Sequence, residues 1–195
     1  MPSERLTRSP LLMSRADVGL LVIDLQERLL AAQPHAARIV ANTRRLIDAA
    51  KALEVAVAMT EQVSDKLGPT VAELAERLPA ARSKSVFSAA ACEEITNAWH
   101  EAGIRQVLLA GIETHVCVAQ TAMDLLSDGF EVFVAVDAVG SRFAIDHETA
   151  LGRMESASVT LTTTEAAMFE WCETADDAAF KAISALAKEV MPEKR

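Results

Sequence analysis

Short, continuous apolar runs alternate with segments of helical periodicity along most of this chain. Continuous apolar runs of strand length occupy residues 18–23, 55–59 and 107–110, and two further segments of strand length, 130–136 and 158–161, include polar residues. Between them, apolar side chains recur at the three- and four-residue spacing of a helix face, as in 92–102 and 145–154. Alternating strands and helices favour a parallel sheet with right-handed crossovers and helices on both faces. We therefore predict a doubly wound, Rossmann-like α/β fold with a mostly parallel six-stranded sheet in the order 3-2-1-4-5-6.

Length and charge limit the organisation and the partners. The 195 residues fit a single domain spanning 1–195, with an N-terminal arm at 1–16 and C-terminal helices in 165–195. A net charge of −9 without a basic stripe argues against nucleic acid and against an anionic membrane as partners. An apolar stripe in the last helix docks on the body or on another subunit, and with 51% hydrophobic residues it predicts a homo-oligomer, at least a dimer. The stripe consists of Phe180, Ile183, Leu186 and Val190.

The cysteines indicate a reducing compartment. The three residues Cys92, Cys117 and Cys172 are odd in number and have no paired spacing. The only apolar cluster near the N-terminus, at residues 11–13, is too short for the core of a signal peptide. We expect reduced thiols and a cytoplasmic protein.

The stretch from Gly111 to Cys117 has the pattern of a strand, a tight turn and a helix. The apolar run 107–110 ends at Gly111, and helical spacing begins near Thr114, a candidate N-cap. Cys117 falls in the first helical turn, where free N–H groups and the helix dipole favour a thiolate. This predicts a nucleophilic cysteine with a pKa below the ordinary value of about 8.5. A small core residue under a helix is the competing interpretation.

Two charged residues are candidates to act with that thiol. Asp24 directly follows the run 18–23, and the expected strand order brings it beside Cys117, where it can accept the thiol proton. A helix N-cap is its alternative role. Lys84, which precedes an expected short strand around Val86 and Phe87, is a cation that can hold Asp24 ionised, unless it is an ordinary surface lysine. No glycine-rich loop follows Asp24, which argues against a dinucleotide site.

Together these motifs resemble the isochorismatase-like cysteine hydrolase superfamily, over about residues 18–165. The resemblance rests on Leu21-Val22-Ile23-Asp24-Leu25-Gln26, Lys84-Ser85-Val86-Phe87-Ser88 and Gly111-Ile112-Glu113-Thr114-His115-Val116-Cys117-Val118. The branch called isochorismatase domain-containing proteins is the most similar. That finer likeness rests on Thr60-Glu61-Gln62, Lys66-Leu67-Gly68-Pro69 and Leu161-Thr162-Thr163-Thr164-Glu165.

The resemblance implies a catalytic triad of Asp24, Lys84 and Cys117. It also implies a cis peptide in the turn, at Ile112–Glu113, and an oxyanion hole made of the backbone N–H groups of Glu113 and Cys117. The implied reaction is attack of Cys117 on a small amide or related carbonyl substrate, through a thioester that water then hydrolyses. Candidates for the substrate pocket are Gln26, Glu61, Phe87 and His115.

The chain departs from the superfamily at two points. Nicotinamidases of this superfamily carry a metal site after the second strand, but residues 60–70 contain no histidine, and the four histidines of the chain are scattered. We expect no metal and no cofactor, so nicotinamidase activity becomes doubtful. Ala90 and Ala91 stand where an aromatic residue is common, which indicates a wider pocket.

Three functions compete. True isochorismatases lack the nucleophilic cysteine, so its presence favours amide hydrolysis over vinyl-ether hydrolysis. The alternatives are a non-catalytic interaction or scaffold protein that keeps the fold, and a thiol redox protein. The absence of a second cysteine at CxxC spacing from Cys117 argues against redox chemistry.

Overall fold

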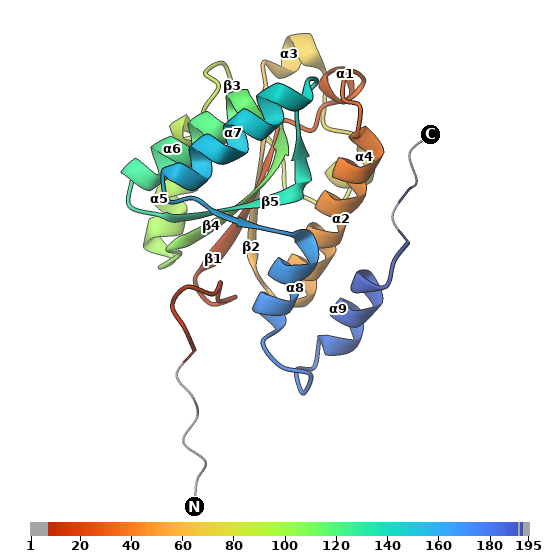
Figure 1. The fold of residues 1–195 in the computed structure, drawn as a ribbon, viewed down its shortest axis with the longest axis vertical. Helices are drawn as coiled ribbons and strands as arrows, with labels where there is room; N and C mark the ends of the chain where they lie inside the picture. Colours follow the sequence, from red (N-terminus) through yellow and green to blue (C-terminus); the bar gives the residue numbers. More distant parts are fainter. Residues whose placement is uncertain (1–7, 191, 193–195) are drawn as a thin grey trace, which may run out of the picture.

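The computed structural model describes residues 8–190 and 192. Its centre is a six-stranded parallel sheet with the order β3-β2-β1-β4-β5-β6, which confirms the predicted fold class and strand order (Figure 1). Residues 1–7 of the predicted arm, and 191 and 193–195 of the predicted C-terminal segment, lie outside the described residues. The strands are β1 (Val18–Ile23), β2 (Ala56–Gln62), β3 (Arg82–Lys84), β4 (Gln106–Ile112), β5 (Glu131–Gly140) and β6 (Thr160–Thr162).

Helices cover both faces of the sheet. The α2, α8 and α9 helices pack over one face, and α5, α6 and α7 pack over the other (Figure 1). The helices are α1 (Glu27–Leu30), α2 (Ala36–Ala52), α3 (Ser64–Leu67), α4 (Ala72–Ala75), α5 (Glu93–Glu101), α6 (Ala119–Ser127), α7 (Ala144–Ser156), α8 (Thr164–Cys172) and α9 (Phe180–Ala187). Two shorter turns are η1 (Ala89–Ala91), a 3-10 helix, and η2 (Thr114–Val118), a π-helix.

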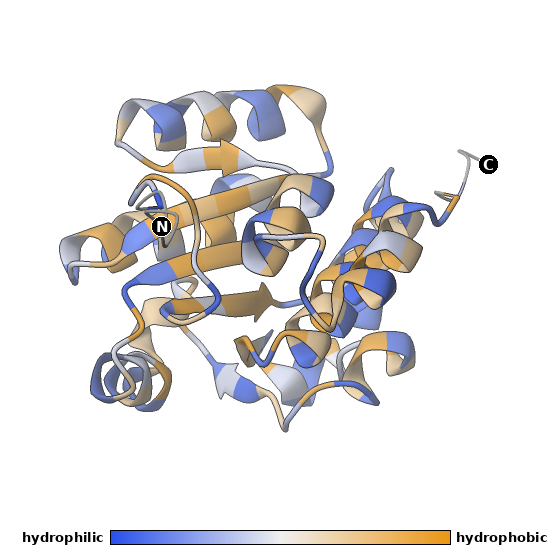
Figure 2. Cartoon of the chain, turned by 90° about the horizontal axis from the view of Figure 1, so that it is seen from below, coloured by the Kyte–Doolittle hydropathy of each residue, from blue (hydrophilic) through white to orange (hydrophobic). Residues whose placement is uncertain are grey.

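The two central strands explain the continuous apolar runs. Every residue of β1 and of β4 is buried, because each strand has a layer of helices on either side. Figure 2 shows hydrophobic residues concentrated on the strands, with hydrophilic residues on the outer sides of the helices. The strands meet closely at their carboxyl ends, where a Cβ on Gly111 would lie 2.0 Å from the carbonyl oxygen of Ile23. Only glycine fits there, with φ at +129°.

One predicted boundary is wrong. The β5 strand does not end with the expected run 130–136 but continues through residues 137–140, because it resumes pairing with β4 after an irregularity between Leu109 and Gly111. The Asp137 side chain then accepts hydrogen bonds from the Thr164 N–H and hydroxyl, at 2.8 and 3.0 Å, and fixes the start of α8. The polar side chain of Asp137 therefore does not mark the end of the strand, because it connects β5 to the start of α8.

The C-terminal stripe docks on the body of the same chain. Ile183 is fully buried, and Phe180 and Leu186 pack against the same cluster as α2 and α8. Val190, the last residue of the stripe, lies beyond α9 and is 92% exposed. The stripe therefore gives no support to the predicted oligomer. Among the helices that the structure describes, none combines the length and the apolar character needed to cross a bilayer.

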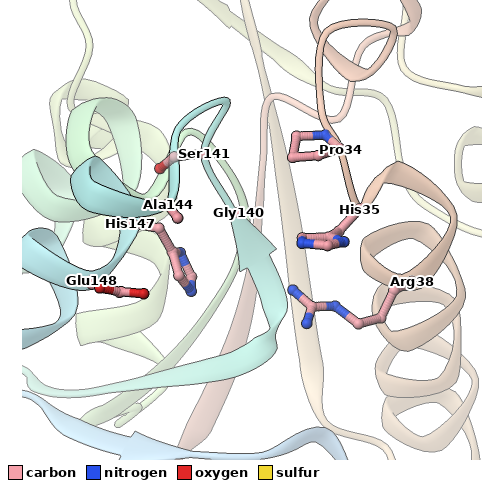
Figure 3. Close-up of a pocket in the computed structure, with 8 residues that line it drawn as sticks. All are labelled: Pro34, His35, Arg38, Gly140, Ser141, Ala144, His147 and Glu148. Carbon is pink, nitrogen blue, oxygen red and sulfur yellow. The ribbon is translucent and has the colours of Figure 1, made fainter. Parts of the chain in front are cut away.

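A cavity of about 190 Å³ opens between the N-terminal ends of α2 and α7 (Figure 3). Its lining residues are Pro34, His35, Arg38, Gly140, Ser141, Ala144, His147 and Glu148.

Candidate active site

Asp24 stands where the chain leaves β1 and is fully buried. Its φ of +55° lies in the left-handed region, which aspartate tolerates better than most residues. Its N–H donates to the Thr60 carbonyl at 3.1 Å, so the chain stays attached to β2 at this point. The Thr60 hydroxyl donates to carboxylate Oδ1 at 2.9 Å, and the Lys84 ammonium donates to Oδ2 at 2.7 Å. Both oxygens of a buried carboxylate are thus satisfied.

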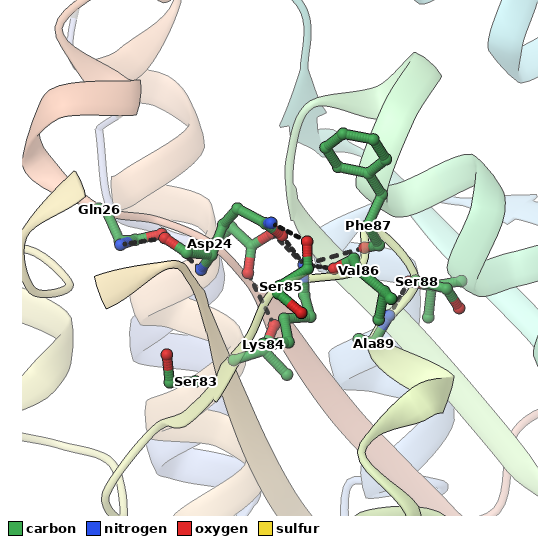
Figure 4. A network of polar contacts seen from close by, with 12 residues as sticks. Asp24, Gln26, Ser83, Lys84, Ser85, Val86, Phe87, Ser88 and Ala89 are labelled. Atoms are coloured by element: carbon green, nitrogen blue, oxygen red, sulfur yellow. Dashed lines mark hydrogen bonds and ion pairs between the residues drawn. The ribbon is translucent and has the colours of Figure 1, made fainter. Parts of the chain in front are cut away.

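Lys84 is the last residue of β3 and lies at the centre of a network of polar contacts (Figure 4). Its side chain is only 2% exposed. Besides Asp24, its Nζ donates to Gln62 Oε1 at 2.7 Å and to the Phe87 carbonyl at 2.9 Å. The prediction of a short strand around Val86 and Phe87 is wrong, because these residues form a loop whose carbonyls turn toward the ammonium. The ion pair is therefore buried and well hydrogen-bonded, the condition under which such a pair is tolerated.

Cys117 lies in η2, is 6% exposed, and is close enough to both charges for each to shift its titration. Burial, followed by the negative charge of Asp24, raises the pKa of its thiol to about 12, although the positive charge of Lys84 acts in the opposite direction. The predicted lowering of this pKa is wrong, because it gave too little weight to burial and to the carboxylate. The resting site is therefore a neutral thiol beside an Asp24–Lys84 ion pair.

The Ile112–Glu113 peptide bond in the turn before Cys117 is cis, in agreement with the prediction. The boundaries of the turn differ from the prediction, because β4 runs through Ile112 and Glu113 rather than Thr114 precedes the helix. The Thr114 hydroxyl makes a 2.9 Å hydrogen bond with His147 Nδ1 and caps nothing. The N–H groups of Val116 and Val118 both donate to the Glu113 carbonyl, which closes the π-helical turn.

The Glu113 side chain fastens this turn to its surroundings. Its carboxylate accepts from Gln33 Nε2 at 3.1 Å and from Arg142 Nε at 2.9 Å. Burial alone would raise the pKa of Glu113, but hydrogen bonds from Arg142 and Gln33 and the charge of Arg142 outweigh it and lower that pKa. The carboxylate thus links the turn to the segments that follow α1 and β5.

Two predicted pocket residues have structural partners instead. The fully buried Gln26 side chain donates to the carbonyls of Gln62, at 3.1 Å, and Gly68, at 2.6 Å, and accepts from the Gln62 N–H at 2.8 Å. Glu61 accepts from the Thr70 N–H and hydroxyl, at 2.7 and 2.9 Å. Their polar atoms are thus engaged by the end of β2 and by the loop that follows it.

The other two pocket candidates lie on different sides of the site. Phe87 is 51% exposed, and its backbone touches Lys84, so it stands beside the ion pair (Figure 4). His115 makes a 3.0 Å hydrogen bond between its Nδ1 and Ser141 Oγ, which directs the ring toward the end of β5. Of the four candidates, Phe87 is the one that contacts the Asp24–Lys84 pair, through its carbonyl and Lys84 Nζ.

Sequence reasoning missed the neutral side chains that hold the triad. Thr60 contacts Asp24 and Gln62 contacts Lys84, and both come from the end of β2. The alternation of side chains along a strand could have indicated these roles, because Thr60 and Gln62 are two residues apart and point to one face, while Glu61 between them points to the other. Gln33 and Arg142, which hold Glu113, come from loops and carry no such signal.

Within residues 8–190 and 192, no group of three or more His, Cys, Asp or Glu side chains is arranged to hold a metal ion.

Comparison with known proteins adds to this geometry. Residues 18–166 match the Isochorismatase domain. The chain is 36% identical to isochorismatase domain-containing protein 2A of Mus musculus over 176 residues, which cover 89% of this chain and 84% of the relative. The structure of the MAR1 ribonuclease of Caenorhabditis elegans superposes with a TM-score of 0.87 and 37% identity, covering 93% of this chain and 95% of the other.

A further similar structure is the YcaC gene product of Escherichia coli, described as an octameric hydrolase of unknown specificity. It has a TM-score of 0.83 and 27% identity, and the match covers 92% of each chain. The domain match covers most of the chain, and the relatives agree with it, so together they identify the family. The chain belongs to the isochorismatase family of hydrolase folds.

Proposed function

We propose that this protein is a metal-independent cysteine hydrolase that cleaves a small amide or a related carbonyl compound. The observation that carries the proposal is the buried Asp24–Lys84 ion pair, 2.7 Å between its charged atoms, acting on the thiol of Cys117. A carboxylate held ionised beside a neutral thiol is a base next to a nucleophile.

The reaction begins with proton transfer. As Cys117 Sγ attacks the carbonyl carbon, its proton passes to Asp24, and the carbonyl π bond becomes an oxyanion. The oxyanion collapses, Asp24 protonates the leaving nitrogen, and a thioester remains on Cys117. Asp24 then takes a proton from water as the water oxygen attacks the thioester carbon. When the C–S bond breaks and the acid is released, Asp24 returns that proton to the Cys117 sulfur, which restores the neutral thiol. Lys84 stays hydrogen-bonded to Asp24 Oδ2 and holds the carboxylate in position.

We place the oxyanion at the backbone N–H groups of Glu113 and Cys117. In support, both residues belong to the turn that leads into η2, and the Glu113 carboxylate anchors that turn to Gln33 and Arg142. Donors fixed before the reaction stabilise developing charge without reorganisation.

Turnover of a panel of small primary amides tests the proposal. We expect Cys117→Ala to abolish release of the acid, and Cys92→Ala, which removes another buried thiol, to leave it intact. Activity should survive exhaustive chelation. Turnover by Cys117→Ala at the wild-type rate would overturn the proposal and favour the scaffold alternative.

The partners we propose are a small molecule and further copies of the chain. Exposed apolar side chains such as Val86 and Phe87, each 51% exposed, support self-association, as does the octameric relative. The similar Caenorhabditis elegans protein is named as a ribonuclease, which suggests RNA as an alternative substrate. A net charge of −9 on this chain opposes binding to the phosphate backbone of RNA. Free thiols at Cys92, Cys117 and Cys172 suit a reducing compartment such as the cytoplasm.

A further inference from the structure

The cavity between α2 and α7 lies away from the triad. Gly140, at the end of β5, forms part of its wall, whereas Asp24 and Lys84 stand at the ends of β1 and β3. In the sheet order, β4 and its turn at Glu113 separate these two regions. The cavity is therefore a second concave site, distinct from the reaction proposed for Cys117.

Basic side chains converge on this cavity. His35 and Arg38 enter from α2 and its preceding residue, and His147 enters from α7 (Figure 3). Figure 3 shows the ring of His147 facing His35 and Arg38 across the cavity, with Glu148 on the far side of that ring. Glu148 is the single carboxylate in the lining.

The positive charge of Arg38 has no counterion among the residues that the structure describes. Its guanidinium makes no hydrogen bond or ion pair with any residue in the described part of the chain, although its Nε is buried. A buried donor without an acceptor costs free energy, so such groups usually have a partner. The α2 helix adds to the positive potential because its first turn contains no acidic residue.

The titration of His147 reflects the same excess of positive charge. Burial, and then the charges of Arg38 and His35, lower the pKa of His147, while Glu148 opposes this lowering. Mutual repulsion of this kind disappears when an anion sits among the cations.

We propose that this cavity binds a small oxyanion, either a carboxylate or a phosphate group, with the Arg38 guanidinium as its principal ligand and His147 as a second. A guanidinium pairs with either group through parallel N–H bonds. A bound anion would also contact the surroundings of the nucleophile, because His147 holds the Thr114 hydroxyl at 2.9 Å and Ser141, in the cavity wall, holds His115.

Titration with inorganic phosphate and, separately, with acetate tests the proposal on the full chain at constant ionic strength. The readouts are calorimetric affinity and the NMR titration of the His147 ring. We expect saturable binding of at least one anion and a rise in the His147 pKa when it is bound. The anion that binds more tightly identifies the ligand as phosphate or carboxylate.

Two variants distinguish anion binding in the cavity from nonspecific attraction to surface charge. Arg38→Gln should weaken binding about tenfold or more, because it removes a charged hydrogen-bond donor. Arg153→Gln, which removes an exposed arginine from the same protein, should leave the affinity unchanged. If circular dichroism shows that Arg38→Gln does not fold, Arg38→Lys replaces it. This variant keeps the positive charge but cannot donate two parallel N–H bonds, so it should bind the anion less tightly than the wild type. Absence of saturable binding of both anions, or equal effects of Arg38→Gln and Arg153→Gln, would overturn the proposal.

Discussion

The Asp24 carboxylate has two tasks that act in opposite directions on Cys117. As a charge it raises the pKa of the thiol, and as a base it is the acceptor for the thiol proton. A site of this kind keeps the nucleophile neutral until a substrate arrives. Low reactivity toward simple alkylating agents is then compatible with an active enzyme.

Asp24→Asn should separate these tasks. Because it removes the negative neighbour and leaves Lys84 in place, the pKa of Cys117 should fall, and alkylation by iodoacetamide at pH 8 should become roughly three- to tenfold faster. Amide turnover should be lost, since no base remains. The control is Asp65→Asn, which removes an exposed carboxylate. Unchanged or slower alkylation of Cys117 in Asp24→Asn would refute this account of the thiol.

The lowered pKa of Glu113 leads us to expect that the stability of the protein depends on pH. Its folded-state pKa is lowered, so its ionised form contributes stability at neutral pH that is lost as the pH falls through the folded pKa. Glu113→Gln should be less stable than the wild type at pH 7, and the difference in free energy of unfolding should shrink below about pH 4.3. Urea denaturation at a series of pH values measures this. A difference that stays constant down to pH 3 would contradict it.

At the scale of elements, the sequence predicted what depends on apolar pattern. The runs that became β1 and β4 are buried along their whole length, so the apolar pattern alone predicted both the strands and their burial. The strand order followed from the expected doubly wound fold class and not from the runs themselves. The failures lie where polar contacts decide the structure. Asp137 lies in β5 and accepts hydrogen bonds from Thr164 at the start of α8, and the loop containing Val86 and Phe87 directs its carbonyls to Lys84.

The same limit applies to the candidate site. Asp24, Lys84 and Cys117 stand out in sequence because they follow or flank strands, whereas Thr60 and Gln62 acquire roles only through contacts with residues far away in the chain. Burial of Cys117, which reverses the expected shift of its pKa, depends on the packing around η2 and leaves no local pattern.

Gly111 tests the junction of β1 and β4. Gly111→Ala should destabilise the protein by roughly 3 kcal/mol or more, because its Cβ would strike the Ile23 carbonyl and its φ is positive. Gly152→Ala is the matched control: it lies within α7 with nothing within 4 Å of the added Cβ, and should be neutral or stabilising by about 1 kcal/mol. Chemical denaturation compares the two. Equal stability of the two variants would show that the strands can separate at this point without cost.

At the scale of the whole molecule, α9 packs against the body of the same chain and is not available for self-association. We therefore expect self-association to use another surface. The loop containing Val86 and Phe87 presents apolar side chains in a fixed position, because Lys84 binds its carbonyls. Light scattering at micromolar concentration should show at least a dimer, and Phe87→Asp should weaken it. Leu11→Asp, a charge at an 81% exposed leucine elsewhere, should not. A wild-type monomer would contradict the prediction.

The central claim is that Cys117 forms an acyl intermediate which Asp24 helps to hydrolyse, and mass spectrometry after mixing with p-nitrophenyl acetate tests it most directly. An activated ester reports on the nucleophile without knowledge of the natural substrate. We predict an acetyl adduct on Cys117 that turns over in the wild type, accumulates in Asp24→Asn and is absent from Cys117→Ala. Acetylation confined to Cys92 or Cys172, or no adduct at any cysteine, would contradict the account.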